Sequence, residues 1–325
     1  MKINPVYAKE LKLRSRTSKF AFTIIIYNTI LIFIALLGFE SVFNVNWNSY
    51  IDYSAASRIY FIIASIEMVM LAFMIPAFTA GSIAGEREKQ TLEILLTTTL
   101  KPEQIIVGKL MSSISMVLLL VVSSLPVISI IFTIGGVSAS DLLRFILLTF
   151  VFALYVGSMG MFASSVVKKT VQATVFTYGL GMIVCFVTAI VVFLTNLISN
   201  IYYYNVMSGT GPWPDVTGVL YILLINPAFT TINMIFDQYG AYSAMDMLQN
   251  GLNGKLPNFI VEHWYWCSIA AQLLCTFCFV KLAAHFLNPL RVKKSKKRGK
   301  KLFGSDVGNE ISFNFRDGLR LGEHT

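Results

Sequence analysis

The chain has 325 residues, of which 55% are hydrophobic and 13% are charged, and its mean hydropathy is +0.67. Soluble domains carry roughly a quarter charged residues, so this composition excludes an ordinary soluble protein and indicates an integral membrane protein. The net charge of +9 lies beside apolar runs, where basic residues set orientation in the membrane, and we expect no nucleic-acid partner.

Residues 1–19 predict a helix that lies in the membrane interface. Asn4 and Pro5 suit a helix start, with asparagine as the cap and proline at the first position. An apolar side would rest among the lipid headgroups while a basic side faces the cytosol. The six basic residues are Lys2, Lys9, Lys12, Arg14, Arg16 and Lys19.

Six apolar runs follow, each long enough to cross roughly 30 Å of hydrocarbon. They cover about 20–39, 59–83, 105–134, 142–167, 171–194 and 264–287. The sequence therefore predicts an all-α membrane protein with a six-helix transmembrane domain at 20–287 and a basic cytoplasmic tail at 288–325. We expect Pro126 to kink the third span and Asp141 to cap the fourth.

The second span carries small residues at Ala77, Gly81 and Gly85. A spacing of four places them on one helix face, so we expect another helix to approach closely there. The same span holds Glu67, which is the one acid well inside a span, and the first span holds Asn28. An unpaired carboxylate is costly in hydrocarbon, so Glu67 must be protonated, paired or next to a wet cavity.

A charged segment lies between the second and third spans. Thr91 is expected to cap a short amphipathic helix, covering about 86–101, that lies on the membrane surface. Pro102 suits the first turn of the next helix. One face of the amphipathic helix would contain Leu92, Leu95, Leu96 and Thr99.

The stretch at 216–236, within an outer loop of about 195–262, is apolar enough to be considered a span. If this stretch crossed the membrane, the number of spans would be odd and the basic tail would lie outside the cell. Asn226-Pro227 also interrupts the stretch, because the residue before a proline disfavours helix. We therefore predict two short helices that dip into the outer leaflet and return.

The distribution of basic residues predicts the orientation. With six spans, 23 of the 26 lysine and arginine residues fall on one side. By the positive-inside rule both termini are then cytoplasmic, in a multi-pass protein of the cell membrane.

Few residues suggest chemistry. Gly108-Lys109 lacks the glycine loop and the hydroxyl of a phosphate-binding motif, so this chain is not expected to hydrolyse ATP. Ser158, between small residues, has no histidine nearby in the sequence and is read as a helix-packing residue. Cys275 and Cys278 have no second pair of metal-ligand residues. We expect no catalytic and no metal-binding residue.

The run from Gly81 to Leu96, with Glu86-Arg87-Glu88 and Thr91-Leu92-Glu93 inside it, resembles the permease subunits of type 2 ATP-binding cassette (ABC) exporters. Gly108-Lys109, which opens the next span, is also similar. That family usually has a proline soon after the paired leucines, whereas here it arrives at Pro102.

The resemblance implies that the amphipathic helix is a coupling helix that docks into a separate ABC ATPase subunit. ATP and Mg would be bound by that partner, with no cofactor in this chain. Two permease subunits, identical or related, would move an unidentified substrate by alternating access. The coupling residues it implies are Glu86, Arg87, Glu88, Thr91, Leu92, Glu93, Leu95 and Leu96.

Three interpretations stay open for Glu67 and Asn28: a substrate path or gate, a structural hydrogen bond across the subunit interface, or a shallower position in the outer leaflet. Two alternatives to the exporter are a membrane scaffold without transport and an intramembrane enzyme. An ion-driven carrier is a third, but it normally needs more intramembrane charge than Glu67 alone.

Overall fold

The structure, a computed structural model, describes residues 5–15, 17–43, 53–97, 101–134, 138–205, 216–238, 245, 248 and 256–287. These residues form helices and connecting turns, without a strand in the described ranges. The basic tail at 288–325, Thr99 and much of the outer loop were predicted features that lie outside the described residues.

Within the described ranges, six helical segments are long and apolar enough to cross a membrane, or up to seven if the bent helix pair described below is one span, and the six confirm the predicted number. An α-helix satisfies its own backbone hydrogen bonds, so apolar segments in hydrocarbon fold as helices. The α6 helix begins at Pro102, as the proline predicted, and contains Pro126. In chain order the segments are α2 (Ser18–Phe43), α3 (Tyr53–Thr79), α6 (Pro102–Ile134), α7 (Ala139–Val166), the run of α8, η1 and α9, and α14 (Trp264–Leu287).

The fifth span is longer than predicted. It consists of α8 (Thr170–Met182), a π-helical turn η1 (Ile183–Val187) and α9 (Thr188–Asn205), so the start of the expected outer loop is helical. The predicted span ended at residue 194 because polar residues follow, but the helix accommodates them. Thr195 donates to the Val191 carbonyl, and Asn200 donates to the Asn196 side chain.

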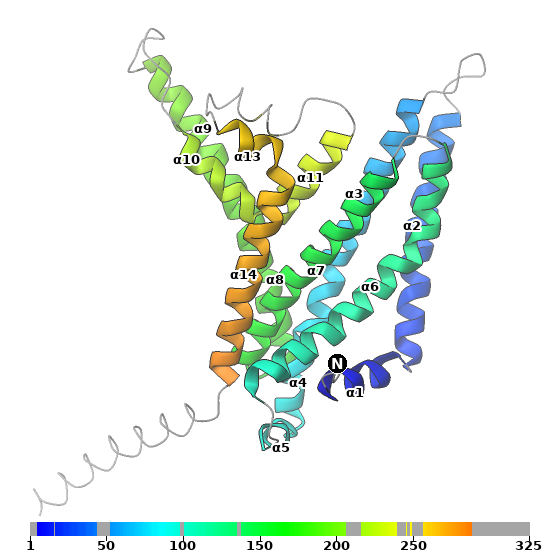
Figure 1. Cartoon of the computed structure of the whole chain (residues 1–325), viewed down its shortest axis with the longest axis vertical. Helices are drawn as coiled ribbons and strands as arrows, with labels where there is room; N and C mark the ends of the chain where they lie inside the picture. The colour runs from blue at the N-terminus through cyan, green and yellow to red at the C-terminus, as the bar shows by residue number, and fades with distance from the viewer. Residues whose placement is uncertain are drawn as a thin grey trace, which may run out of the picture.

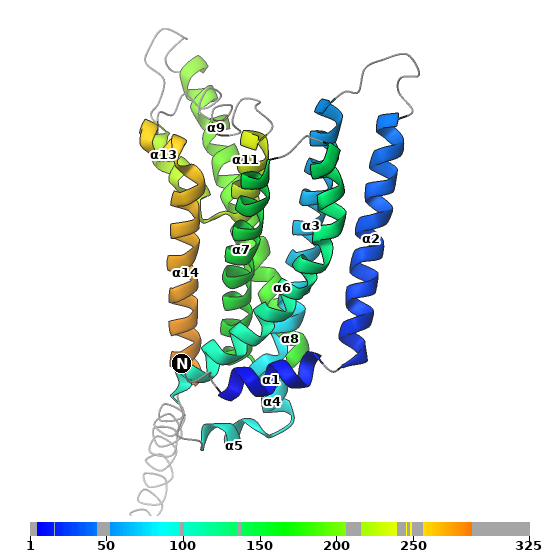
Figure 2. The ribbon, with the colours of Figure 1, turned by 45° about the vertical axis from the view of Figure 1, so that its right-hand side comes forward.

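Short helices gather at the two ends of the bundle. Three of them, α1 (Pro5–Ser15), α4 (Gly81–Glu88) and α5 (Leu92–Leu96), lie at one end, here called the α5 end (Figures 1 and 2). At the opposite α13 end lie α10 (Thr217–Leu220), the 3₁₀ turn η2 (Tyr221–Ile225), α11 (Pro227–Gln238) and α13 (Asn258–Glu262). The predicted N-terminal helix is helical from Pro5 to Ser15, and its expected cap, Asn4, lies outside the described residues.

The apolar stretch before the last span is a bent helix pair. Its two halves meet at Asn226 with an angle of 97°. This bend confirms the prediction that Asn226-Pro227 interrupts the stretch. A helix pair bent in this way is either a broken span or a re-entrant loop.

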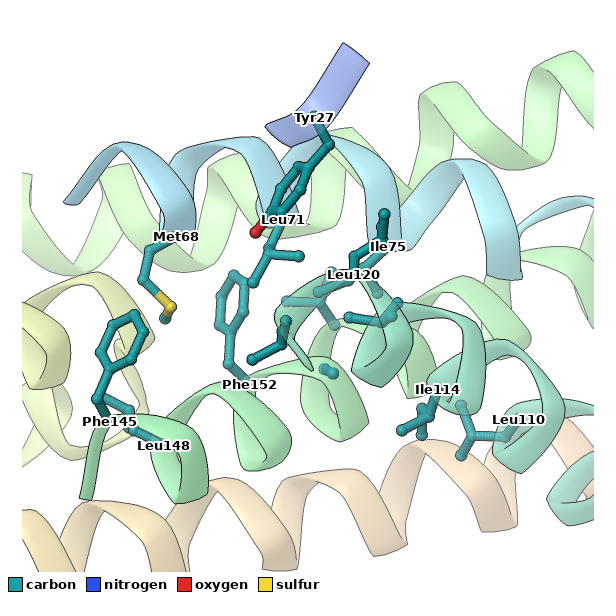
Figure 3. Packing of buried hydrophobic residues seen from close by; sticks show 14 of the residues in the cluster. Tyr27, Met68, Leu71, Ile75, Leu110, Ile114, Leu120, Phe145, Leu148 and Phe152 are labelled. Carbon is teal, nitrogen blue, oxygen red and sulfur yellow. The ribbon is translucent and has the colours of Figure 1, made fainter. Parts of the chain in front are cut away.

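The core of the bundle surrounds α7. In this span 72% of the most apolar window is buried, against 11% for the fifth span, so α7 is central and the fifth span is peripheral. Helices α3, α6, α8 and α14 pack against α7. Phe145, Leu148 and Phe152 of α7 meet residues of α3 and α6 in the interior (Figure 3).

The α7 helix begins with a capping box. Ser138 is the N-cap, its hydroxyl accepts from the Asp141 amide, and the Asp141 carboxylate accepts from the Ser138 amide. The prediction of Asp141 as the cap residue was therefore wrong, because Asp141 occupies the third helical position of the box.

Candidate functional site

The charged segment at the α5 end is divided into two helices. α4 ends at Glu88, and α5 begins at Leu92, so one continuous helix over 86–101 is not formed. Gln90 has φ 58°, the left-handed conformation that closes the turn between them. Thr91 was predicted to cap with its side-chain oxygen, which was wrong: its hydroxyl and its amide both donate to the Glu86 carbonyl.

Lys109 joins three helices at this end. Its Nζ is 2.6 Å from Glu10 Oε1 of α1 and 2.8 Å from Glu86 Oε1 of α4, and it donates to the Ser82 carbonyl at 3.1 Å. The side chain is 1% exposed. The three protons of the ammonium therefore match three acceptors, which lets a full charge be buried on α6.

Arg87 and Glu88 bind α4 to the turn between α7 and α8. The two terminal nitrogens of Arg87 donate to the Val167 carbonyl at 2.8 Å and the Ser165 carbonyl at 3.0 Å. The Glu88 carboxylate accepts from the amide and the hydroxyl of Thr170. The cation thus lies at the carboxyl end of α7 and the anion at the amino end of α8, where each complements the helix dipole.

Close packing adds to these polar links. The Ser164 hydroxyl accepts from the amides of Ile83 (2.9 Å) and Ala84 (2.8 Å), which have no acceptor inside the first turn of α4. Gly81 and Gly85 both lie against Thr170 of α8, and a Cβ on Gly81 would come within 3.1 Å of its methyl carbon. The close approach predicted from the small residues is confirmed for these two glycines.

The short α5 helix has one face against the bundle and one face in the open. Leu92 is buried, while Leu95 and Leu96 are partly buried and pack on the main core. Glu93 is exposed, and Ile94 is 70% exposed. The structure thus gives the predicted leucines an internal contact and presents Ile94 outward.

Ile94 was missed in the sequence, although a signal was present. At 100° per residue it lies opposite Leu92 and Leu96, so it is an apolar residue on the otherwise polar face. The α5 tip therefore combines one exposed aliphatic side chain with the neighbouring charge of Glu93. Such a tip can be gripped by a partner's apolar pocket.

Glu67 and Asn28 lie elsewhere, between α2, α3 and α6. Glu67 is fully buried, and its Oε1 accepts from Tyr27 (3.0 Å) and from Ser124 (2.7 Å). Asn28 donates to the neighbouring Ser123 at 2.8 Å. Tyr27 enters the interior that also holds Leu71 and Phe152 (Figure 3).

Tyr27 and Ser124 hold one oxygen of Glu67 within this chain, on α2 and α6. The other oxygen, Oε2, is buried and has no partner among the described residues. The same ranges contain no group of three or more His, Cys, Asp or Glu residues placed to hold a metal ion.

A comparison with protein families matches the model described as "ABC-2 family transporter protein" to residues 13–284. The match includes the first five spans, α4, α5, the bent pair and α14 as far as residue 284, but only the last three residues of α1. No curated protein sequence matches the chain.

Proposed function

Because the chain belongs to the ABC-2 family of transporter membrane proteins, we propose that it is the permease subunit of an ATP-driven exporter. Its substrate is not specified by the sequence or the fold. A second permease subunit, identical or related, completes the path. Alternating access at the interface of the two moves the substrate outward.

The energy source is a separate subunit. The sequence has no Gly-x-x-x-x-Gly-Lys-Ser/Thr motif to cradle phosphates, which supports a non-catalytic chain. ATP and Mg are then bound by an ABC ATPase partner. The positive-inside distribution of lysine and arginine supports a cytoplasmic α5 end, on the side where ATP is available.

The observation that carries this proposal is the exposed tip of α5 on a firmly held base. Ile94 and Glu93 are presented outward, whereas α4 is bonded to α6 through Lys109 and to the α7–α8 turn through Arg87. A force applied to α5 therefore reaches several spans at once. A flexible loop would dissipate the same force before it reached the bundle.

The proposed stroke has three parts. ATP binding closes the two ATPase subunits, which move α5. Because α4 and α5 are joined by the closed turn at Gln90, α4 moves with it. Helices α3 and α6, which flank this segment in the chain, and α7 then shift relative to the second subunit.

Co-purification tests this function. The chain is purified in mild detergent as wild type, as Ile94→Asp and as Leu13→Asp, and the bound proteins are identified by mass spectrometry. Leu13 is 64% exposed on α1, so Leu13→Asp is a matched control for a charge on an exposed leucine or isoleucine at the same end. We expect an ABC ATPase with wild type and Leu13→Asp, and its loss with Ile94→Asp.

The opposite outcome is equally clear. A correctly inserted wild-type chain that retains no ATPase refutes the permease reading and favours a membrane scaffold. Equal retention by Ile94→Asp and wild type refutes the role given to α5.

A further inference from the structure

The π-helical turn in the fifth span faces the break in the bent helix pair. Asn226, at the break, donates from Nδ2 to the Cys185 carbonyl of η1 at 3.2 Å and to the Thr188 hydroxyl at 2.7 Å. The Thr188 hydroxyl itself donates to the Val184 carbonyl at 2.7 Å. Asn226 lies 41 residues after Cys185 and 38 residues after Thr188 in the chain, so one amide side chain joins the break of the bent pair to the π turn.

The other end of the same side chain starts α11. Asn226 Oδ1 accepts from the amides of Ala228 (2.9 Å) and Phe229 (3.1 Å), in the first turn of that helix. An amide side chain has two donor hydrogens and two acceptor lone pairs, and here all four are used. Asn226 is 4% exposed, so no group of this amide depends on water.

The far side of the bent pair is fixed to α14. Ser268 donates to the Leu224 carbonyl at 2.8 Å, and Gln272 donates to Thr230 at 3.2 Å and to Ser268 at 3.1 Å. The Ser268 and Gln272 side chains are fully buried. Irregular backbone at membrane depth survives only where protein groups satisfy it, and α14 supplies these groups on one side while the fifth span supplies them on the other.

Whereas α8 packs against α7, α4 and α3, the later part of the fifth span, α9, has few packing partners within the chain. Beyond its continuation into η1, the packing of α9 in the described residues is against α10 and η2 of the bent pair. Figure 1 shows α9 leaning away from α3 and α7 towards the α13 end. A change in the direction of α9 would occur most readily at the π turn, because helix bends occur at such turns, and the bent pair contacts this turn directly.

We propose that Asn226 is a positioning residue that seats the bent pair in the π turn, so that α9 and α11 move as one unit. The unit would form the outer part of the proposed export path, and only this last clause rests on the proposed function. Thr188 is its partner on the fifth span. Breaking the contact frees α9 to change direction independently of α11.

The test compares four substitutions in the full permease–ATPase complex in lipid nanodiscs. Thr188→Val removes the hydroxyl at nearly constant volume, and Thr188→Ser retains it. Thr195→Val is the matched control, because Thr195 lies in the same helix and its hydroxyl bonds only within that helix. Asn226→Ser is a second disrupting variant that keeps a helix cap but cannot reach the π turn.

Fluorine NMR reports the two helices separately. The four cysteines, Cys185, Cys267, Cys275 and Cys278, are replaced by alanine, and a trifluoromethyl probe is attached to one new cysteine. One sample carries Ile201→Cys on α9 and another carries Ile232→Cys on α11, where the native side chains are 51% and 43% exposed. Cys185 contacts the bent pair through its backbone carbonyl and also through its thiol, which meets the Ala228 backbone, so the chain without native cysteines is the reference for every variant.

In the wild type we expect the populations at the two reporters to change together when ATP is added and trapped. Thr188→Val and Asn226→Ser should shift the population ratio at Ile201→Cys by about 3-fold, which is the bias of a typical interhelical hydrogen bond in a membrane. The population ratio at the α11 reporter, Ile232→Cys, should not shift with it. Thr188→Ser should restore the wild-type ratio, and Thr195→Val should match it throughout.

The inference is overturned if both disrupting variants give the same spectra as Thr195→Val. An ATP response that is absent at both reporters, while the ATP-free spectra still differ as expected, refutes the proposed function and leaves the positioning role intact. If the disrupting variants only lost their fold, the signals of both reporters would broaden and no separate shift of the α9 reporter would be seen.

Discussion

Replacing Lys109 by methionine should destabilise the α5 end, because two carboxylates then share a site without the cation between them. Glu10 and Glu86 each lie within 2.8 Å of Nζ, so their oxygens are on the order of 5 Å apart. Two like charges at about 5 Å with an effective dielectric constant of about 20 repel by roughly 3 kcal/mol. The two side chains are 17% and 27% exposed, and screening by water reduces the expected loss to about 2 kcal/mol.

The free energy of unfolding is measured by titrating the purified chain in mixed micelles with a denaturing detergent. Lys101→Met is the matched control, because Lys101 is exposed and precedes the same helix. A triple variant with Glu10→Gln, Lys109→Met and Glu86→Gln should recover most of the stability, since no like charges remain. The reasoning is refuted if Lys109→Met and Lys101→Met unfold alike, or if the triple variant is less stable than Lys109→Met.

Three further predictions, with five substitutions, probe other contacts by the same titration. Gly160→Ala would place a Cβ 2.9 Å from the Thr79 Cβ and should lower the free energy of unfolding by about 1–3 kcal/mol. Gly181→Ala, whose Cβ would meet nothing within 4 Å, should raise it by about 0.5–1 kcal/mol. Equal effects of the two substitutions would contradict the close packing at Gly160. Glu67→Gln should keep the free energy of unfolding within about 1 kcal/mol, whereas Glu67→Leu should lower it by about 1–3 kcal/mol, because only glutamine can accept from Tyr27 and Ser124. Loss of ATP-dependent activity in a stable Glu67→Gln variant would support the gating role. Arg87→Lys should cost about 1 kcal/mol, because an ammonium cannot hold two carbonyls in a planar fork, and an unchanged stability would show that the fork is not needed.

The spans could be predicted from the sequence because the bilayer imposes one simple rule, a helix of about 20 apolar residues. The break at Asn226 was also visible, since a proline follows it directly. The length of the fifth span was not. Thr195 and Asn200 look like loop residues in a hydropathy profile, but their side chains bond within α9 and so continue the helix.

The position of the candidate site in the chain could be predicted from the sequence, but its helix boundaries and contacts could not. The charged segment stands out between two apolar spans, yet the division at Gln90 had no sequence signal, because glycine or asparagine is the usual left-handed residue. Lys109 contacts Glu10 and Glu86, which lie 99 and 23 residues before it in the chain, and no local sequence pattern reveals such contacts. Ile94 was overlooked because the leucine face looked like the contact surface, although the bundle itself covers Leu92.

The central claim is that the tip of α5 touches an ATPase, and a photo-crosslinking amino acid at position 94 tests it most directly. The wild-type complex with the probe in place of Ile94 is irradiated in membranes, with and without trapped ATP, and compared with the same probe in place of Leu13. The account predicts a crosslink to an ATP-binding subunit from position 94 alone, with a yield that changes on adding ATP. Crosslinks from position 94 to lipid or to this chain only, in a complex that retains its ATPase, would contradict it.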